Sequence, residues 1–123
     1  MESPLITVIT VSYNAASSIE QTIISVINQT YPHIEYIIID GGSTDNTVDI
    51  IKKYADKISY WVSEPDKGIY DAMNKGIKIA AGKYTLFMNV NDTFYASSSI
   101  AEVCNLMEKY DSQHDAYYGN CLL

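Results

Sequence analysis

The chain has 123 residues, which suits one domain with a sizeable core and is too short for two ordinary domains. Hydrophobic residues make up 47% and charged residues 19% of the sequence, a composition that excludes a disordered chain. The formal net charge is −7 and all eight basic residues are lysines, so a nucleic-acid polymer is not an expected partner. If phosphates bind, backbone N–H groups or a divalent cation held by carboxylates must neutralise them.

Targeting and membrane-spanning segments are not expected. Met1 leads through Pro4 into a strand, without the basic and apolar regions of a signal peptide. No apolar run approaches the roughly 20 residues that a membrane span requires. Cys104 and Cys121 have no close Cys or His partner in the sequence and are expected to be free thiols of a reducing compartment. We therefore expect a cytoplasmic protein, which could still associate peripherally with the inner face of the membrane.

The apolar pattern predicts strands and helices in alternation along the chain. Strands are predicted at residues 5–12, 35–40, 58–63 and 84–88, with a fifth beginning at 116. Helices are predicted between the cap at 17–18 and the stop at 30–32, and at residues 45–54, 69–80 and 97–110. Such alternation favours an α/β fold, with a mostly parallel, doubly wound sheet covered by helices on both faces. Because the chain ends just after the fifth strand begins, we expect the sheet to be incomplete at its C-terminus.

The predicted third helix has apolar residues on one face. Six positions recur at helical spacing and are expected to face the sheet: Ile69, Ala72, Met73, Gly76, Ile77 and Ala80. Gly76 lies mid-helix, where glycine costs roughly 1 kcal/mol relative to alanine. Its presence indicates close packing that leaves no room for a side chain.

The segment 35–47 changes character twice and is the strongest indication of a ligand site. A strand buried on both faces ends at Asp40, two glycines follow, and a Ser/Thr/Asp/Asn cluster then begins a helix. In α/β sheets, ligands bind beyond the carboxyl ends of strands and at helix N-termini. Asp40 could make only a local turn over Gly41, or it could accept hydrogen bonds from a base or ribose.

Other strand ends offer further candidates, each with a plainer alternative. Asp92 could be a turn residue or an oxygen ligand for Mg²⁺ or Mn²⁺ that bridges a diphosphate. Tyr13 could pack with its hydroxyl in water, or its ring could stack on a base. Asp71 could serve only the helix dipole, but it lies at the same edge of the sheet. We expect Asp40 and Asp92 to open into one shared cleft.

The sequence lacks the motifs of several enzyme classes. No Gly-x-Gly-x-x-Gly follows the first strand, and there is no P-loop, Gly-x-Ser-x-Gly elbow or Cys/His pairing. A dehydrogenase, a P-loop NTPase, a serine hydrolase and a cysteine enzyme are therefore not expected. His33 and His114 have no partner at metal-ligand spacing and are interpreted as surface residues.

Motifs typical of one family appear in order over about residues 5–92. The first is the end of the first strand, residues 8–14, which finishes in Ser-Tyr-Asn. The second is Ile-Ile-Asp-Gly-Gly-Ser-Thr-Asp-Asn-Thr at 38–47. The others are residues 63–76 and the Asn-Val-Asn-Asp segment that follows residue 88. Together they resemble the family 2 glycosyltransferases, nucleotide-diphosphosugar enzymes of the GT-A fold. The Glu-Pro-Asp-Lys-Gly-Ile-Tyr-Asp-Ala-Met-Asn run is similar to that of bacterial enzymes that build exopolysaccharide, capsule or lipopolysaccharide chains.

The resemblance implies specific roles for residues of this chain. Asp92 matches the last acid of the family's Asp-x-Asp-like motif, which binds a divalent cation, Mn²⁺ or Mg²⁺, between the diphosphate oxygens. Asn91 stands where an Asp often precedes it and can offer a carbonyl oxygen or hydrogen-bond a ribose hydroxyl. The resemblance implies that the nucleotide, commonly a uridine, is bound by Val11, Ser12, Tyr13, Asp40, Gly42, Ser43, Asp71 and Asn91.

The resemblance also implies the reaction. A nucleotide-diphosphosugar donor, UDP-linked in most cases, would transfer its sugar with inversion to a saccharide or lipid-linked acceptor. The family's general base comes from a carboxylate downstream of the Asp-x-Asp motif and is expected beyond Leu123. Residues 1–123 would then be the donor-binding half, which binds but does not turn over alone. A non-catalytic nucleotide-sugar sensor and a plain α/β interaction module remain the alternatives.

Overall fold

The computed structural model describes residues 4–90, 97–110 and 116–118. Helices and strands alternate as predicted, with boundaries that differ by a few residues. The elements are β1 (Ile6–Ser12), α1 (Ile19–Ile27), β2 (Ile34–Asp40), α2 (Thr47–Lys53), a 3₁₀ turn (Ala55–Lys57), β3 (Tyr60–Ser63), α3 (Ile69–Ile79), β4 (Tyr84–Phe87), α4 (Ser99–Tyr110) and β5 (Ala116–Tyr118).

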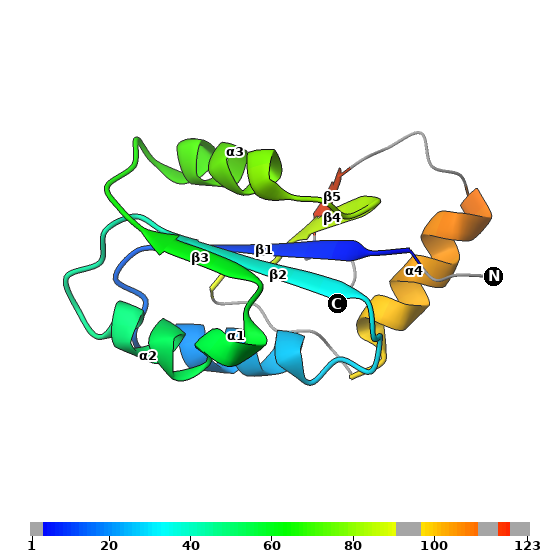
Figure 1. Ribbon diagram of the computed structural model, residues 1–123, viewed down its shortest axis with the longest axis horizontal. Coiled ribbons are helices and arrows are strands. Elements are labelled where there is room, and N and C mark those ends of the chain that lie inside the picture. Colours follow the sequence, from blue (N-terminus) through cyan, green and yellow to red (C-terminus); the bar gives the residue numbers. More distant parts are fainter. Residues whose placement is uncertain (1–3, 91–96, 111–115, 119–123) are drawn as a thin grey trace.

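In the part of the chain that is described, the strands form one parallel sheet in the order β3-β2-β1-β4-β5. The order runs outward from β1 to β3 and then reverses, because β4 pairs with the other side of β1. Helix α3 makes this crossing on one face, and α1 and α2 cover the opposite face (Figure 1). The predicted doubly wound α/β fold is confirmed. Its topological switch point, where open α/β sheets bind ligands, lies between β1 and β4.

Strand β2 is buried on both faces, as its run of isoleucines predicts. Ile37 and Ile39 pack with Ala72 of α3 on one face of the sheet. Ile38 belongs to the larger cluster that α1 and α4 share on the other face, together with Ile19 and others. This alternation places the last residue of the strand, Asp40, at the carboxyl edge of the sheet with apolar layers on either side.

The apolar face predicted for α3 is only partly correct. Ala72 and Gly76 are buried, but Ile69 and Ile77 are 52% and 46% exposed. Among the described helices, none lies beside α3 on this face of the sheet (Figure 1), and only a narrow stripe of α3 touches the strands. Along that stripe the approach is close, because a Cβ at Gly76 would lie 2.8 Å from Cγ2 of Ile9. The predicted close packing at Gly76 is confirmed.

Within the described residues, no helix is both long and apolar enough to span a membrane. Cys104 is a buried free cysteine, as expected. Cys121 lies outside the residues that the structure describes.

Candidate active site at the carboxyl edge of the sheet

A cleft of about 590 Å³ opens at the carboxyl ends of the strands. Its walls come from the end of β1, the turn after β2, the loop between β3 and α3, the start of α3 and the segment after β4. The described lining residues are Val11, Ser12, Tyr13, Gly41, Pro65, Asp66, Gly68, Ile69, Ala72 and Val90. The cleft therefore lies at the switch point of the sheet, where sequence and fold both predict ligand binding.

The β1 end of the cleft is held by the loop that follows β2. Asn14 adopts a left-handed conformation, with φ of 47°. Its backbone N–H donates to Oγ of Ser43 at 2.7 Å, and its Oδ1 accepts from the backbone N–H of Thr44 at 2.8 Å. These bonds fix the turn after Tyr13, whose side chain is 62% exposed beside the cleft. Of the predicted nucleotide-binding residues, Val11, Ser12 and Tyr13 thus line the cleft.

Asp40 lies beneath the cleft and is fully buried. Its Oδ1 accepts from the hydroxyls of Ser12 at 2.7 Å and Ser43 at 2.6 Å. Its Oδ2 accepts from the Ser63 hydroxyl at 2.8 Å, and from the backbone N–H groups of Ser43 at 2.8 Å and Gly42 at 3.2 Å. Ser12, Asp40 and Ser63 stand side by side at the ends of β1, β2 and β3, so one carboxylate joins three strands.

The surroundings of Asp40 favour its ionised form. Burial raises the pKa of the carboxyl, but the bonds from Ser43, Ser12 and Ser63 together outweigh burial and leave the pKa below its ordinary value of 3.8. The N–H groups of Gly42 and Ser43 point at this carboxylate and not into the cleft. The predicted contacts of Asp40, Gly42 and Ser43 with a nucleotide stay predictions, and the structure shows that these groups already bind one another.

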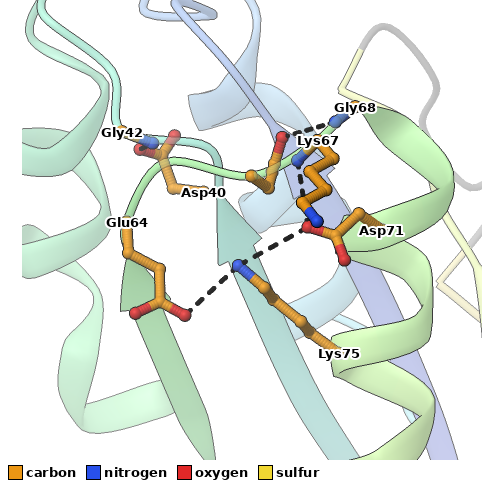
Figure 2. A network of polar contacts seen from close by, with 8 residues as sticks. Asp40, Gly42, Glu64, Lys67, Gly68, Asp71 and Lys75 are labelled. Carbon is orange, nitrogen blue, oxygen red and sulfur yellow. Dashed lines mark hydrogen bonds and ion pairs between the residues drawn. The ribbon is translucent and has the colours of Figure 1, made fainter.

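The opposite wall is the loop between β3 and α3, shown with its polar contacts in Figure 2. Oδ1 of Asp66 accepts from the N–H of Gly68 at 3.0 Å. Oδ2 of Asp71 accepts from the N–H of Lys67 at 3.0 Å. Gly68, with φ of +117°, is the residue before α3 and adopts a conformation that side chains rarely permit. The loop therefore turns sharply into the helix and presents Asp66 to the cleft.

Lys75 anchors this loop from α3. Its Nζ lies 3.2 Å from Oε1 of Glu64 and 3.9 Å from Oδ2 of Asp71, and Figure 2 shows the ammonium group between the two carboxylates. Asp71 thus lies at the predicted edge of the sheet. It accepts a hydrogen bond from the loop between β3 and α3 and is not among the described residues that line the cleft. Its contact with a nucleotide remains a prediction.

The predicted metal ligand, Asp92, and its neighbour Asn91 lie outside the described residues. No three His, Cys, Asp or Glu side chains within the described ranges are grouped so that they could hold a metal ion. The chain does reach the cleft just before this motif, since Val90 lines it and the Val90 carbonyl accepts from the hydroxyl of Thr22 at 2.7 Å. The shared cleft expected for Asp40 and Asp92 is therefore not tested.

The wall of the cleft opposite β1 is not among the site residues predicted from the sequence. Pro65, Asp66 and Gly68 follow a strand whose carboxyl end lies at the same edge of the sheet as Asp40. That position was the available signal. Gly41 was also missed as a lining residue, because nothing local in the sequence indicates which loop approaches it.

Comparison with curated proteins finds glycosyltransferases. The chain is 30% identical over 126 residues to the PGL/p-HBAD biosynthesis glycosyltransferase of Mycobacterium tuberculosis. The alignment covers all of this chain and 49% of the relative. It is 38% identical over 109 residues to the teichuronic acid biosynthesis glycosyltransferase TuaG of Bacillus subtilis. This alignment covers 86% of the chain and 43% of TuaG. The chain thus spans about half the length, or less, of these curated relatives.

Two solved structures with the same fold contain a nucleotide or a nucleotide sugar. Residues 1–349 of TarS from Staphylococcus aureus in complex with UDP give a TM-score of 0.76 at 25% identity, over 85% of this chain and 32% of that one. The mannosyltransferase PcManGT from Pyrobaculum calidifontis in complex with GDP-Man and Mn²⁺ gives 0.75 at 26% identity, over 82% and 31%. The predicted GT-A fold is confirmed by these likenesses.

The family itself is decided by a match that covers most of the sequence. The model of the family described as glycosyl transferase family 2 matches residues 7–120. The match includes both loops of the cleft, the buried Asp40 and the Asn91-Asp92 pair. The chain belongs to glycosyltransferase family 2.

Proposed function

We propose that this chain binds a nucleotide-diphosphosugar, UDP-linked, and supplies the donor site of an inverting glycosyltransferase of bacterial polysaccharide biosynthesis. The observation that carries the proposal is the cleft at the carboxyl ends of β1 and β2, next to the segment that leads into Asn91 and Asp92. Its volume of about 590 Å³ lies within the usual range for small-molecule sites. The family match and the UDP bound to TarS support this donor class.

The lining indicates how such a donor would be held. Apolar surface from Val11, Pro65 and Ile69, with the exposed ring of Tyr13, suits a flat base and a ribose. None of the described lining residues is a lysine, so the cleft side chains described here bring no positive charge to a diphosphate. We expect a divalent cation, Mn²⁺ or Mg²⁺, held by Asp92, to neutralise the diphosphate charge when bound. The Mn²⁺ in PcManGT supports a cation of this kind.

The acceptor side of the reaction is proposed from the relatives. The names of the mycobacterial relative and TuaG refer to PGL/p-HBAD biosynthesis and teichuronic acid biosynthesis, and we propose a saccharide or lipid-linked acceptor. In-line transfer with inversion requires a general base on the acceptor hydroxyl. We expect that base in the part of the relatives that the alignment does not cover, and we expect the 123-residue chain to bind the donor without turnover.

Calorimetric titration of the 123-residue chain with UDP in the presence of Mn²⁺ tests donor binding. We expect saturable binding that is weakened when the metal is chelated. An absence of binding at millimolar UDP would favour a plain α/β interaction module instead. The enzyme and the non-catalytic sensor differ in turnover, so glycosyl transfer by the full-length protein, compared with transfer by the chain alone, distinguishes those two functions.

A further inference from the structure

We propose that Asp66, and not Asp40, is the carboxylate that reads the nucleobase of the donor. The inference rests on the proposed function, since it requires a nucleotide in the cleft. It assigns base specificity to a residue outside the set that the family resemblance implied. It also gives Asp40 a different task, which is to position the floor of the cleft.

Asp40 has no free acceptor surface for a base. The residue is fully buried, and both of its oxygens already accept hydrogen bonds from hydroxyl and backbone donors. A base could reach this carboxylate only by displacing the serines or the Gly41–Gly42 turn around it. Because these bonds hold Ser12 and the turn in place, Asp40 acts as a positioning residue for the cleft floor.

Asp66 has the properties that Asp40 lacks. It lines the cleft and is only half-buried. One oxygen, Oδ1, accepts from the N–H of Gly68 at 3.0 Å, which fixes the orientation of the carboxylate. The other oxygen, Oδ2, accepts no hydrogen bond from any residue in the described ranges. The Asp66 carboxylate is therefore oriented by the bond to Oδ1, while Oδ2 can accept a hydrogen bond from a ligand.

Gly41 makes room for this carboxylate. A Cβ built on Gly41 would lie 2.8 Å from Oδ2 of Asp66, closer than real Cβ atoms approach, and 3.3 Å from its Cγ. Gly41 is not among the residues with positive φ, so its backbone would accept another amino acid. The glycine at position 41 is thus explained by the lack of space for a side chain, and not by its backbone conformation. The Asp66 carboxylate fills the volume at the end of β2 that a side chain at position 41 would occupy.

A carboxylate at this place distinguishes bases by their donors. Uracil presents an N3–H and guanine an N1–H, and either can donate to Oδ2 of Asp66. The corresponding N3 of cytosine is an acceptor, which a carboxylate repels. A hydrogen bond to a charged group contributes enough to change affinity by about tenfold or more. We therefore expect the cleft to bind UDP more tightly than CDP by at least about tenfold.

The test compares UDP and CDP by calorimetry, with Mn²⁺ present, for the wild-type chain and Asp66→Asn. An amide has an oxygen at only one of the two positions that Oδ1 and Oδ2 of Asp66 occupy, so it can accept from the Gly68 N–H or from a base N–H on the other side, while its NH₂ can donate to cytosine. We expect Asp66→Asn to lose about tenfold in UDP affinity and to lose most of the preference for UDP over CDP. Equal weakening for both nucleotides would indicate a ribose contact and would overturn the proposal, as would an unchanged preference.

A second variant tests the same contact independently, in case Asp66→Asn does not fold. Gly41→Ala adds one methyl group that must push the Asp66 carboxylate aside, and a flexible side chain can yield without disturbing the fold. We expect the same loss of UDP preference, with an unfolding midpoint close to that of the wild type. Asp56→Asn is the matched control, because Asp56 is exposed in the turn that precedes β3, at the opposite edge of the sheet.

The outcomes separate this inference from the proposed function. A wild-type chain that binds neither nucleotide would overturn both. A wild-type chain that binds UDP, together with variants at positions 66 and 41 that keep the full preference for UDP over CDP, would overturn only the assignment to Asp66. Loss of the preference in both variants, with Asp56→Asn unchanged, would support it.

Discussion

Replacing Asp40 by asparagine removes the charge that joins three strand ends while leaving the side-chain volume nearly unchanged. The carboxylate accepts five hydrogen bonds from Ser12, Gly42, Ser43 and Ser63. An amide offers one acceptor oxygen and an NH₂ group that can only donate. The best orientation places the oxygen toward the two backbone N–H groups, because the hydroxyl groups can rotate and a backbone N–H cannot.

Even in that orientation the hydroxyls of Ser12 and Ser43 lose their acceptor in a buried site. Hydrogen bonds to a charged group contribute about 1.5–3 kcal/mol each, and neutral ones about 1 kcal/mol. Loss of the charge and displacement of two hydroxyl donors should lower the free energy of unfolding by roughly 2–4 kcal/mol. For a chain of this length, such a change corresponds to a fall in Tm of about 8–15 °C.

Equilibrium unfolding in urea at several pH values measures the effect and its cause. The pKa of Asp40 is lower in the folded chain than its ordinary value of 3.8. The ionised carboxylate therefore adds stability above that value, and this stability is lost as the pH falls through the lower, folded pKa. Asparagine cannot titrate, so the difference between wild type and Asp40→Asn should be full at neutral pH and shrink below pH 3.8.

Asp56→Asn again serves as the control, since Asp56 is exposed and should change the free energy of unfolding by less than about 0.5 kcal/mol. A loss below about 1 kcal/mol at neutral pH in Asp40→Asn would show that the serine bonds contribute little. A large loss that does not diminish in acid would show that shape, and not charge, is what the site requires. Either result would refute the role given to Asp40.

Three further changes probe the packing around the cleft. Gly76→Ala should lower the free energy of unfolding by about 1 kcal/mol in urea titrations, since overpacking against Ile9 at 2.8 Å exceeds the gain in helix propensity. Gly68→Ala should cost about 1–3 kcal/mol by the same assay and weaken UDP binding, because φ of +117° strains any side chain although no atom lies within 4 Å of the added Cβ. Lys75→Met should cost less than about 1 kcal/mol, with the difference from wild type falling in high salt, because its ion pairs are partly exposed.

The sequence predicted the fold well because the relevant signals are local. Strands such as residues 35–40 are short apolar runs rich in β-branched residues, and their alternation with helices leaves few topologies other than a parallel doubly wound sheet. The apolar face of α3 was predicted only in part, for a non-local reason. Helical spacing places Ile69 and Ile77 on the apolar stripe, but only the tertiary arrangement decides how wide a stripe the sheet covers.

The sequence predicts that a ligand site lies at the carboxyl edge of the sheet, where the cleft is found, but not which residues contact one another there. Strand ends identified Tyr13 and Asp40, since parallel strands all end at one edge, and the family resemblance added Ser12. The burial of Asp40 depends on Ser12 and Ser63, which are 28 and 23 residues away and become neighbours only through the sheet register. The opposition of Gly41 and Asp66 is equally non-local, and spacing along the chain contains no sign of it.

The two sides of the cleft are built from interactions of different strength. The floor is a buried carboxylate with hydrogen bonds from three strands, an arrangement that is costly to break because the donors would be left unsatisfied. The wall opposite is held by backbone bonds to Asp66 and Asp71 and by the partly exposed ion pairs of Lys75, which water and salt weaken. If a donor changes the shape of the cleft as it binds, the loop between β3 and α3 is therefore the side that can move at low cost. That is also the loop that carries Asp66, so adjustment of the wall and recognition of the base would occur in the same segment.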